Sequence, residues 1–390
     1  MSILIKGGRV LNPATHTDDV LDILVEKNKI TKVSKNIEVQ ADEIIDATGL
    51  LIMPGFIDMH VHLRDPGLTY KEDICTGAAA AARGGVTTIC AMPNTKPVVD
   101  SVDTLNYILQ KAETVPVNVK QLSAITIDMA GKELVDIQAM HDGGAIAFSE
   151  DGKSVMDINL YQEALDKVAS MGGLVMAHCE EKDLVGKGVL NKGIASERYD
   201  VPGISNAVED IITARDIFLA QEAGVRLHLC HCSTKNVVEL IKLGKHIGVQ
   251  VTGEACPHHF ILSDSNIDKA DSNFKMNPPL RSEEDVKAII EGLKDGTIEV
   301  ISTDHAPHSQ EEKALNFEES PFGIVGLETS ASLTYTALVA TDILSPLEMA
   351  AKMSYNPAKI LGMDNQYGRL EEDMIADIAI YNPNVEDIID

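Results

Sequence analysis

The feature that most constrains this chain is a regular alternation of short apolar runs with polar loops and helical stretches between about residues 54 and 364. Strands that alternate with helices form parallel sheets, because each crossover helix returns the chain to the same edge. The apolar runs predict eight strands, at 56–63, 86–92, 117–125, 145–148, 174–177, 225–230, 249–253 and 300–303. Eight such units favour an α/β fold with a closed (β/α)8 TIM-type barrel over an open sheet.

The two ends of the chain have a different pattern. Short β-like runs at 3–5, 22–26, 29–33 and 43–46 are separated by turn residues, and a similar run returns at 377–381. We therefore expect residues 1–53 plus 365–390 to form a small β-sandwich-like domain. The barrel, residues 54–364, would be inserted between its two parts.

Composition excludes several classes of protein. A formal charge of −27, from 33 basic and 60 acidic residues, argues against nucleic-acid binding, which needs clustered Lys and Arg. The sequence has no apolar run of about 18 residues, as a membrane span requires, and its first residues do not resemble a signal peptide. Six cysteines in so long a chain do not make a disulfide scaffold. We expect a reduced, cytoplasmic enzyme.

The first predicted barrel strand ends in Asp58-Met-His60-Val-His62-Leu-Arg64. Alternate side chains of a strand point to the same face, so His60 and His62 lie together there. Two imidazoles one pleat apart form half of a metal site. Arg64, on the same face, supplies a fixed cation that can hold an anionic group of a substrate.

Further polar residues follow other predicted strands at the carboxyl end, where barrel enzymes carry their sites. These residues are Asp151, His178, His231 and Asp304. With His60 and His62 they exceed the four ligands of one zinc ion and suit two metal ions about 3.5–4 Å apart. Asp151, beside Gly152, is the natural bridging ligand, and zinc fits the imidazoles best, although manganese and cobalt stay open. Asp304 could also accept the proton of an attacking hydroxide and return it to a leaving nitrogen.

Each of these residues has an ordinary structural interpretation when taken alone. A His at a strand end is commonly just hydrogen-bonded, an Asp-Gly pair is usually a turn, and an Asp after a strand is often a helix cap. These six residues lie at the ends of five different strands, and such a coincidence favours a metal site over six separate structural roles. By pleat alternation we expect Cys179, Cys230 and Cys232 to be buried thiols facing away from it. The pair His258-His259, after Cys256-Pro257, we expect to be structural.

Three segments carry candidate substrate groups. Asn94 follows the second predicted strand and offers both a donor and an acceptor, and Asn277 follows the seventh. After the eighth, His308 precedes a long polar loop, 309–320, of the kind that often forms a lid. The loop ends at Phe322-Gly323, whose backbone could hydrogen-bond a small ring.

The motifs at 58–67, Met92-Pro-Asn-Thr-Lys-Pro97, Asp304-His-Ala-Pro-His308 and 321–329 together resemble type I dihydroorotases, of the amidohydrolase superfamily. The resemblance covers nearly the whole chain. It implies the reversible cyclisation of N-carbamoyl-L-aspartate to L-dihydroorotate in de novo pyrimidine (UMP) biosynthesis.

The resemblance also implies roles for the site residues. His60 and His62 would hold one zinc ion and His178 and His231 the second, two per subunit, bridged by Asp151 and hydroxide. Asp304 would bind the first ion and act as the acid/base. The substrate would lie beside His62, and its contacts would be Arg64, Asn94 and His308 on the carboxylate and Asn277, Phe322 and Gly323 on the ring amides.

Two features depart from what some relatives of that family show. Many amidohydrolases bridge their metals with a carbamylated lysine, but Asp151 takes that position here, so we expect no modified lysine. The chain also ends soon after Asn382-Pro-Asn384, where another strand or two of the small domain is expected. Either the sequence is shortened or the small domain is incomplete.

Two other functions compete with this interpretation. A hydantoinase or allantoinase cleaves a related cyclic amide, but Arg64 and Asn94 favour a substrate that carries a carboxylate. A barrel without activity could serve as a scaffold for an aspartate carbamoyltransferase, yet such a protein should have lost ligands, and all six are present. Partners other than the small substrate stay open, including a second copy of the chain in a homodimer and the transferase.

Overall fold

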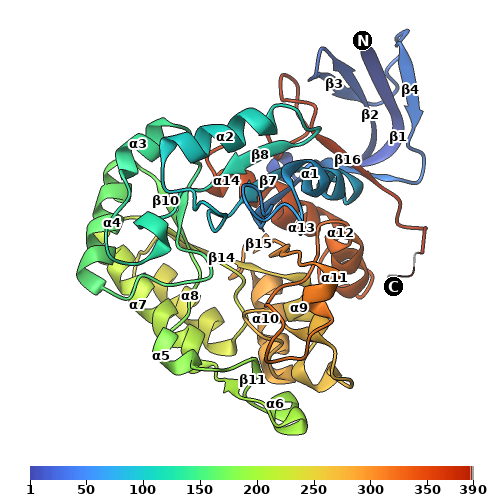
Figure 1. The fold of residues 1–390 in the computed structure, drawn as a ribbon. Helices are drawn as coiled ribbons and strands as arrows, with labels where there is room; N and C mark the ends of the chain where they lie inside the picture. The colour runs from blue at the N-terminus through green and yellow to red at the C-terminus, as the bar shows by residue number, and fades with distance from the viewer. Residues whose placement is uncertain (387, 389–390) are drawn as a thin grey trace. The chain divides into compact units, whose positions relative to one another are not determined.

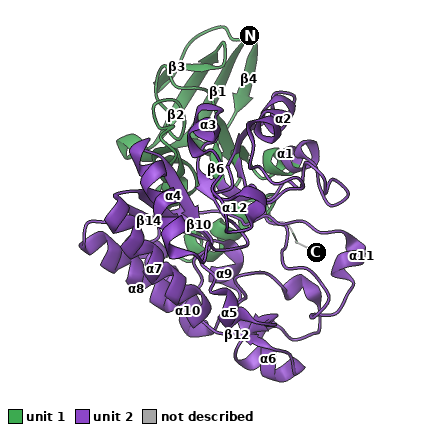
Figure 2. Cartoon of the chain, turned by 60° about the vertical axis from the view of Figure 1, so that its left-hand side comes forward, with its two compact units in different colours: residues 1–58, 80–89, 327–390 green, residues 59–79, 90–326 purple. Residues whose placement is uncertain are grey.

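The computed structural model describes residues 1–386 and 388. Its contacts divide the chain into two compact units, one of residues 1–58, 80–89 and 327–390 and one of residues 59–79 and 90–326 (Figure 2). This division does not coincide with the boundaries drawn from the sequence, 1–53 plus 365–390 and 54–364, which stay a prediction.

Eight parallel strands form the barrel, one at each predicted position. They are β6 (Phe56–Val61), β7 (Val86–Ala91), β8 (Asn118–Gln121), β9 (Phe148–Ser149), β10 (Leu174–Ala177), β13 (Arg226–Leu229), β14 (Val251–Ala255) and β15 (Val300–Ile301). They run in the order β6-β7-β8 and β9-β10-β13-β14-β15. Parallel bridges from Ser123 to Phe148 and from Val61 to His305 join the two sets. The predicted (β/α)8 fold is confirmed.

Helices follow the strands, and Figure 1 shows α4, α7, α8 and α10 on the outside of β10 and β14. The longer helices are α1 (Ile74–Arg83), α2 (Val102–Ala112), α4 (Ile158–Ser170), α7 (Ala207–Ala223), α8 (Lys235–His246) and α10 (Glu283–Asp295), and the short α3 (Ile137–Asp142) precedes β9. Ser282 caps α10 by accepting a hydrogen bond from the Asp285 amide, because the first amides of a helix have no partner within it.

The remaining helices and strands outside the small β-domain are short. They are α5 (Lys182–Val185), β11 (Leu190–Asn191), α6 (Ile194–Tyr199), β12 (Gly203–Ile204), α9 (Pro257–Ile261), α11 (Gln310–Lys313), α12 (Ser330–Thr334), α13 (Pro346–Ala350) and α14 (Asn356–Ile360). Single turns of other helical types lie at Pro13–Thr15, Ile127–Met129, Asp264–Asn266, Ser272–Phe274, Tyr335–Val339 and Ala351–Tyr355. Ser345 and Glu348 form the capping box that begins α13, with Pro346 in its first turn.

The small β-domain is a mixed sheet built from both ends of the chain, as predicted. Its strands are β1 (Ser2–Asn12), β2 (Thr17–Glu26), β3 (Lys29–Ser34), β4 (Glu43–Asp46), β5 (Leu51–Pro54) and β16 (Ile378–Tyr381). β1 is the centre, antiparallel to β2 and parallel to both β4 and β5, and β16 pairs antiparallel with β5. Adjacent residues of β1 point to opposite faces, and Leu4 and Ile5 belong to separate apolar clusters. Both faces of the sheet are therefore packed.

Among the residues that the structure describes, no helix has both the length and the apolar character that crossing a bilayer would require.

Candidate active site

The predicted ligands converge at one end of the barrel because parallel strands present their carboxyl ends to the same side. His60 lies in β6 and His62 just beyond it, and Asp151, His178, His231 and Asp304 follow β9, β10, β13 and β15. All six side chains are buried. The strand ends thus bring together residues that are up to 244 positions apart in the sequence.

The Asp151 carboxylate is the centre of this group. Its Oδ1 lies 3.3 Å from His60 Nε2, 3.6 Å from His178 Nδ1 and 3.7 Å from His231 Nε2, and its Oδ2 lies 3.5 Å from His62 Nε2. The other carboxylate, Asp304, places its Oδ1 3.0 Å from His62 Nε2 and 3.5 Å from His60 Nε2. One carboxylate therefore faces all four imidazoles, as a bridging ligand would.

These residues fit metal ions. Two groups have their ligand atoms within 4.8 Å of one another, His60–His62–Asp151 and Asp151–His178–His231, and they share only Asp151. Asp151 Oδ1 and His178 Nε2 are buried and accept or donate no hydrogen bond among the described residues. Buried polar atoms are normally satisfied, so such a concentration of unsatisfied ones at a ligand cluster is what a cation site requires.

Charge at the cluster shifts the pKa values in opposite directions. Burial lowers the pKa of His178, but its contacts with Asp151 and Glu180 outweigh this and raise it to about 10. Burial raises the pKa of Asp304, but the hydrogen bond from His62 and the neighbouring imidazoles lower it to about 2. Asp151 is likewise held well below its usual pKa by the imidazoles that surround it, in spite of burial. The carboxylates are anionic at neutral pH, which suits ligands and a proton acceptor.

Glu254, which the sequence analysis did not select, contacts two of the candidate ligands. Its Oε1 accepts a hydrogen bond from His60 Nδ1 at 2.8 Å and from the His231 backbone amide at 3.2 Å, and its Oε2 lies 3.1 Å from His228 Nε2. A carboxylate on the far nitrogen fixes the ring so that the other nitrogen offers its lone pair to a metal. The predicted strand ended at Gly253, whereas β14 continues to Ala255. A glutamate inside a buried strand was the missed signal, since a buried charge needs partners.

Cys230 does not face away from the site, as pleat alternation suggested. It forms a close group with His60 and Glu254. The reason is that β13 ends at Leu229, and His231 has a left-handed φ of 33°, so the alternation no longer holds there. Cys179 and Cys232 are buried, as expected.

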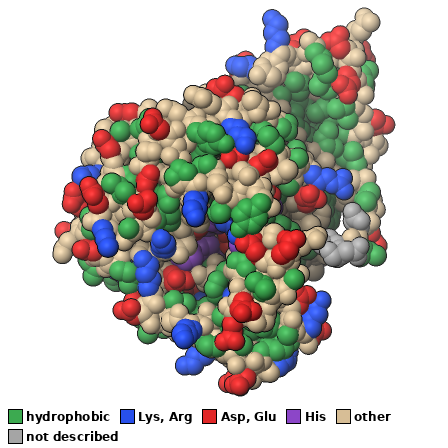
Figure 3. All heavy atoms as spheres, in the orientation of Figure 1, with side chains coloured by type: hydrophobic (Ala, Val, Ile, Leu, Met, Phe, Trp, Pro, Cys, Tyr) green, Lys and Arg blue, Asp and Glu red, His purple; other side chains and the backbone are tan. Residues whose placement is uncertain are grey.

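A pocket of about 180 Å³ opens above the cluster, and Figure 3 shows histidine side chains at the bottom of a hollow with Lys and Arg side chains nearby. Ten of the twelve predicted site residues line it: His62, Arg64, Asn94, Asp151, His178, His231, Asn277, Asp304, Phe322 and Gly323. Of the other two, His60 lies beneath Asp151, fully buried. His308 lies behind Arg64, 3.3 Å from its Nη2.

Arg64 and His308 belong to a connected polar wall. The Arg64 Nε donates to the Pro307 carbonyl at 3.2 Å. Burial and the adjacent Arg64 and Lys71 lower the pKa of His308 to about 4, so its ring is neutral. Lys71 Nζ lies 3.0 Å from His308 Nδ1, and His308 Nε2 donates to the Phe322 carbonyl at 2.7 Å. Lys71 was also missed, and it adds a second cation to the wall.

Of the two predicted asparagines, Asn94 contacts the ligand cluster directly, and Asn277 reaches it through Glu180. Asn94 accepts from His62 Nδ1 at 2.9 Å and donates to Asp151 Oδ2 at 3.2 Å, so it fixes two ligands at once. Asn277 donates to Glu180 Oε2 at 2.5 Å, and the same oxygen lies 3.6 Å from His178 Nε2. Glu180 is a third residue that the sequence analysis did not select.

Strained backbone also marks the site. Arg64, His231 and Asp304 have φ values of 59°, 33° and 51°, which non-glycine residues adopt rarely and at a cost. At Gly323 a Cβ would lie 2.6 Å from the Ala306 carbonyl oxygen, so only glycine fits there. Such strain persists where the surrounding structure holds a side chain in one required direction.

Comparison with known proteins connects this geometry to a family. A family model described as dihydro-orotase-like matches residues 49–237. The dihydroorotase of Pelotomaculum thermopropionicum is 44% identical over 390 residues, covering 100% of this chain and 91% of that protein. The dihydroorotase of Clostridioides difficile is 45% identical over 385 residues, covering 98% and 91%.

Solved structures show the same architecture. The L-hydantoinase (dihydropyrimidinase) from Arthrobacter aurescens is 27% identical, with a TM-score of 0.86, and the match covers 96% of this chain and 86% of that one. The dihydropyrimidinase from Brevibacillus agri, at 23% identity and a TM-score of 0.85, shares the fold. With full-length relatives at this level of identity and a metal-ligand cluster in place, the chain belongs to the dihydroorotase family of metal-dependent cyclic amidohydrolases.

Proposed function

We propose that the chain is a dihydroorotase, which interconverts N-carbamoyl-L-aspartate and L-dihydroorotate in cytoplasmic pyrimidine (UMP) biosynthesis. The observation that carries the proposal is the position of Asp151, whose carboxylate faces four imidazoles at the bottom of a pocket that Arg64 and Asp304 also line. The relatives named dihydroorotase support the choice of substrate.

The proposed cofactor is a pair of zinc ions. His60 and His62 would hold one and His178 and His231 the other, with Asp151 shared between them and Asp304 on the first, a division supported by the two ligand groups that meet at Asp151. When bound, such ions polarise a carbonyl and lower the pKa of water. No modified lysine is needed, because Asp151 already supplies the bridging anion.

Asp304 is the proposed acid/base. In ring opening, water adds to the amide carbonyl carbon of the ring, the carbon–nitrogen bond breaks, and the water oxygen stays in the new carboxylate. Asp304, ionised because its pKa is about 2, accepts one proton of the water and passes it to the departing ring nitrogen. The second proton leaves to solvent. The reverse sequence closes the ring.

The pocket wall supports a substrate that carries a carboxylate. Arg64 is a permanent cation whose planar donors match a carboxylate, and Asn94 and the neutral His308 lie beside it in this proposal. Asn277 and the backbone of Phe322 and Gly323 are the proposed partners of the ring amides. His62 would lie between the substrate and the metal.

A hydantoinase-type activity is the alternative that one observation favours, since the solved structures with the same fold bear that name. The distinguishing experiment is to assay purified protein with L-dihydroorotate and with dihydrouracil, which is the same ring without the carboxylate. We expect ring opening of dihydroorotate to be at least about 100-fold faster, because a charge-assisted contact is lost with dihydrouracil. A preference for dihydrouracil would contradict the proposal, and no turnover of either ring would indicate a scaffold protein.

A homodimer and an association with aspartate carbamoyltransferase complete the proposal. Light scattering of the protein alone, and after mixing with that transferase, measures both. A monomer whose mass does not change on mixing would contradict both proposed associations, and the proposed activity would be unaffected.

A further inference from the structure

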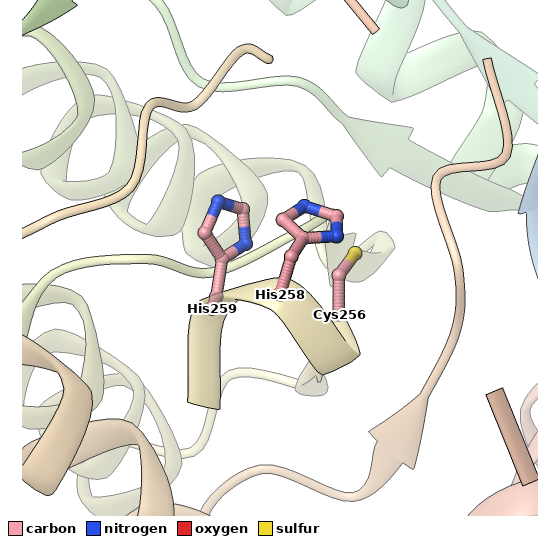
Figure 4. A group of neighbouring side chains, drawn as sticks. All are labelled: Cys256, His258 and His259. Atoms are coloured by element: carbon pink, nitrogen blue, oxygen red, sulfur yellow. The ribbon is translucent and has the colours of Figure 1, made fainter. Parts of the chain in front are cut away.

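A second histidine group lies outside the Asp151 cluster, on the turn that follows β14. Cys256 precedes α9, and His258 and His259 are in it. The sulfur and one nitrogen of each ring lie within 4.8 Å of one another. Figure 4 shows the three side chains leaving the same side of the turn, with the thiol beside the His258 ring and that ring beside His259. None of the three belongs to the Asp151 groups.

The three side chains are buried, and each histidine has one ring nitrogen without a hydrogen-bond partner among the described residues. His258 and His259 are 8% and 2% exposed, and Cys256 is fully buried. His258 Nε2 and His259 Nδ1 have no hydrogen-bond partner in the part of the chain that the structure describes. Two unsatisfied ring nitrogens in adjacent residues are unusual, because a buried polar atom without a partner is destabilising.

The orientation of His259 points to a ligand. Its Nε2 donates to the Pro278 carbonyl at 3.0 Å, so the proton is on that nitrogen and the lone pair is on Nδ1. Nδ1 is the atom that lies unsatisfied, and it faces the group. A metal-binding imidazole is usually oriented in this way, by a hydrogen bond from its far nitrogen to a carboxylate, a backbone carbonyl or water.

Both rings are also in the protonation state that metal binding needs. Burial lowers the pKa of His258 to about 4 and that of His259 well below its ordinary value. A neutral imidazole keeps one lone pair, and no proton has to be removed from it before a cation binds.

We propose that Cys256, His258 and His259 form a separate metal site of the thiolate–imidazole type, which takes a thiophilic d10 cation, Zn²⁺ or Cu⁺. A thiolate and two imidazoles select these soft ions over Mg²⁺ or Mn²⁺, which prefer oxygen ligands. Binding forms one metal–sulfur and two metal–nitrogen bonds and releases the thiol proton to solvent. The site differs in kind from the Asp151 cluster, whose predicted ligands are imidazoles and carboxylates.

The position of the site suggests what it stabilises. His259 joins α9 to the carbonyl of Pro278, the residue next to Asn277 in the pocket. A cation that fixes His259 therefore also fixes one end of the segment that carries Asn277. The proposed metal site therefore has a structural role and takes no part in the reaction.

Cobalt substitution tests the proposal without any activity measurement. A Co²⁺ ion bound to a thiolate gives an intense sulfur-to-metal charge-transfer absorption, which imidazole and carboxylate ligands do not give. We expect the full-length protein, stripped of metal and saturated with Co²⁺, to show this band. Cys256→Ser and His259→Gln should abolish or shift it, and metal analysis of Cys256→Ser should show about one equivalent less metal per chain.

Cys230→Ser is the matched control, because Cys230 is also a buried thiol grouped with a histidine, His60. It should keep the band. Loss of the band in Cys230→Ser with retention in Cys256→Ser would overturn the proposal, and so would the absence of any band in the saturated protein. Circular dichroism of each variant establishes that it is folded, and His259→Gln keeps the test decisive if Cys256→Ser does not fold. Titration with Zn²⁺ and with Cu⁺ under reducing conditions then identifies the preferred ion.

Discussion

His178, in the Asp151 cluster, and His258, on the α9 turn, are both buried histidines, yet their pKa values lie on opposite sides of neutrality. Burial lowers both, but the contacts of His178 with Asp151 and Glu180 bring its pKa to about 10, whereas that of His258 is about 4. Neither His258 nor His259 makes an ion pair with a carboxylate among the described residues. The difference teaches that carboxylate contact, and not burial, decides whether an imidazole here holds a proton.

The two groups should therefore bind cations differently. At the Asp151 cluster a metal ion replaces protons, and the carboxylates supply compensating charge. At the α9 turn the imidazoles are already neutral, and only the thiol of Cys256 has a proton to lose.

The largest expected effect comes from removing the carboxylate that we assign to proton transfer. Asp304→Asn should lower kcat for dihydroorotate by about 10²–10⁴-fold, the usual contribution of a general acid/base, and should keep most of the metal. Steady-state kinetics and metal analysis measure the two effects separately. Asp103→Asn, an exposed position in the first turn of α2, is the control and should be close to the parent. Near-normal turnover in Asp304→Asn would remove Asp304 from this role.

The next effect concerns the carboxylate behind the cluster. Glu254→Gln should weaken metal binding at the Asp151 cluster by about 10–100-fold, because His60 loses its charged orienting partner. Competition with a chromophoric chelator measures the affinity. The cobalt–thiolate band of the α9 turn should not change, since Glu254 is not among its ligands. A parallel loss at both groups would show that the variant disturbs the barrel as a whole.

A smaller effect is the pH dependence of metal binding. The raised pKa of His178 means that metal-free protein holds a proton there at neutral pH, so a cation must displace it. Affinity at the Asp151 cluster should rise with pH up to about 10, the pKa of His178 in the metal-free fold, because a smaller fraction of the protein then holds the competing proton. Calorimetric titrations in buffers of different ionisation enthalpy count the released protons. Metal binding at the Asp151 cluster without proton release at pH 7 would show that His178 holds no proton there, and would contradict the difference drawn between His178 and His258.

The smallest effect is at His308, whose neighbours are cations. Lys71→Met should raise the pKa of His308 from about 4 towards the ordinary value, because one of the charges that lower it is gone while burial and Arg64 stay. NMR titration of the ring protons follows it. An unchanged or lower pKa would mean that neighbouring charge does not govern the histidines of this pocket.

The sequence predicts much of this architecture, because the information is local. Apolar runs and turn residues located all eight barrel strands. The six candidate ligands could be predicted together because each lies at or near the carboxyl end of a barrel strand, and parallel strands end on one side. Side-chain positions that depend on contacts between distant segments could not be predicted from these local patterns.

Three residues illustrate what was missed. Glu254 lay one position beyond the predicted strand, and its role depends on His60, 194 positions away. Cys230 joins His60 and Glu254 while its neighbour His231 joins Asp151, because the left-handed φ at His231 ends the alternation of faces, which no spacing rule anticipates. Lys71 reaches His308 from a loop, where periodicity carries no information about direction.

The central claim is that metal ions held around Asp151 support ring opening of dihydroorotate, and metal removal tests it most directly. Protein stripped by a chelator should lose ring opening, and added Zn²⁺ should restore it. An Asp151→Asn variant treated identically should not recover at the same zinc concentration. Ring opening that survives complete metal removal would contradict the account.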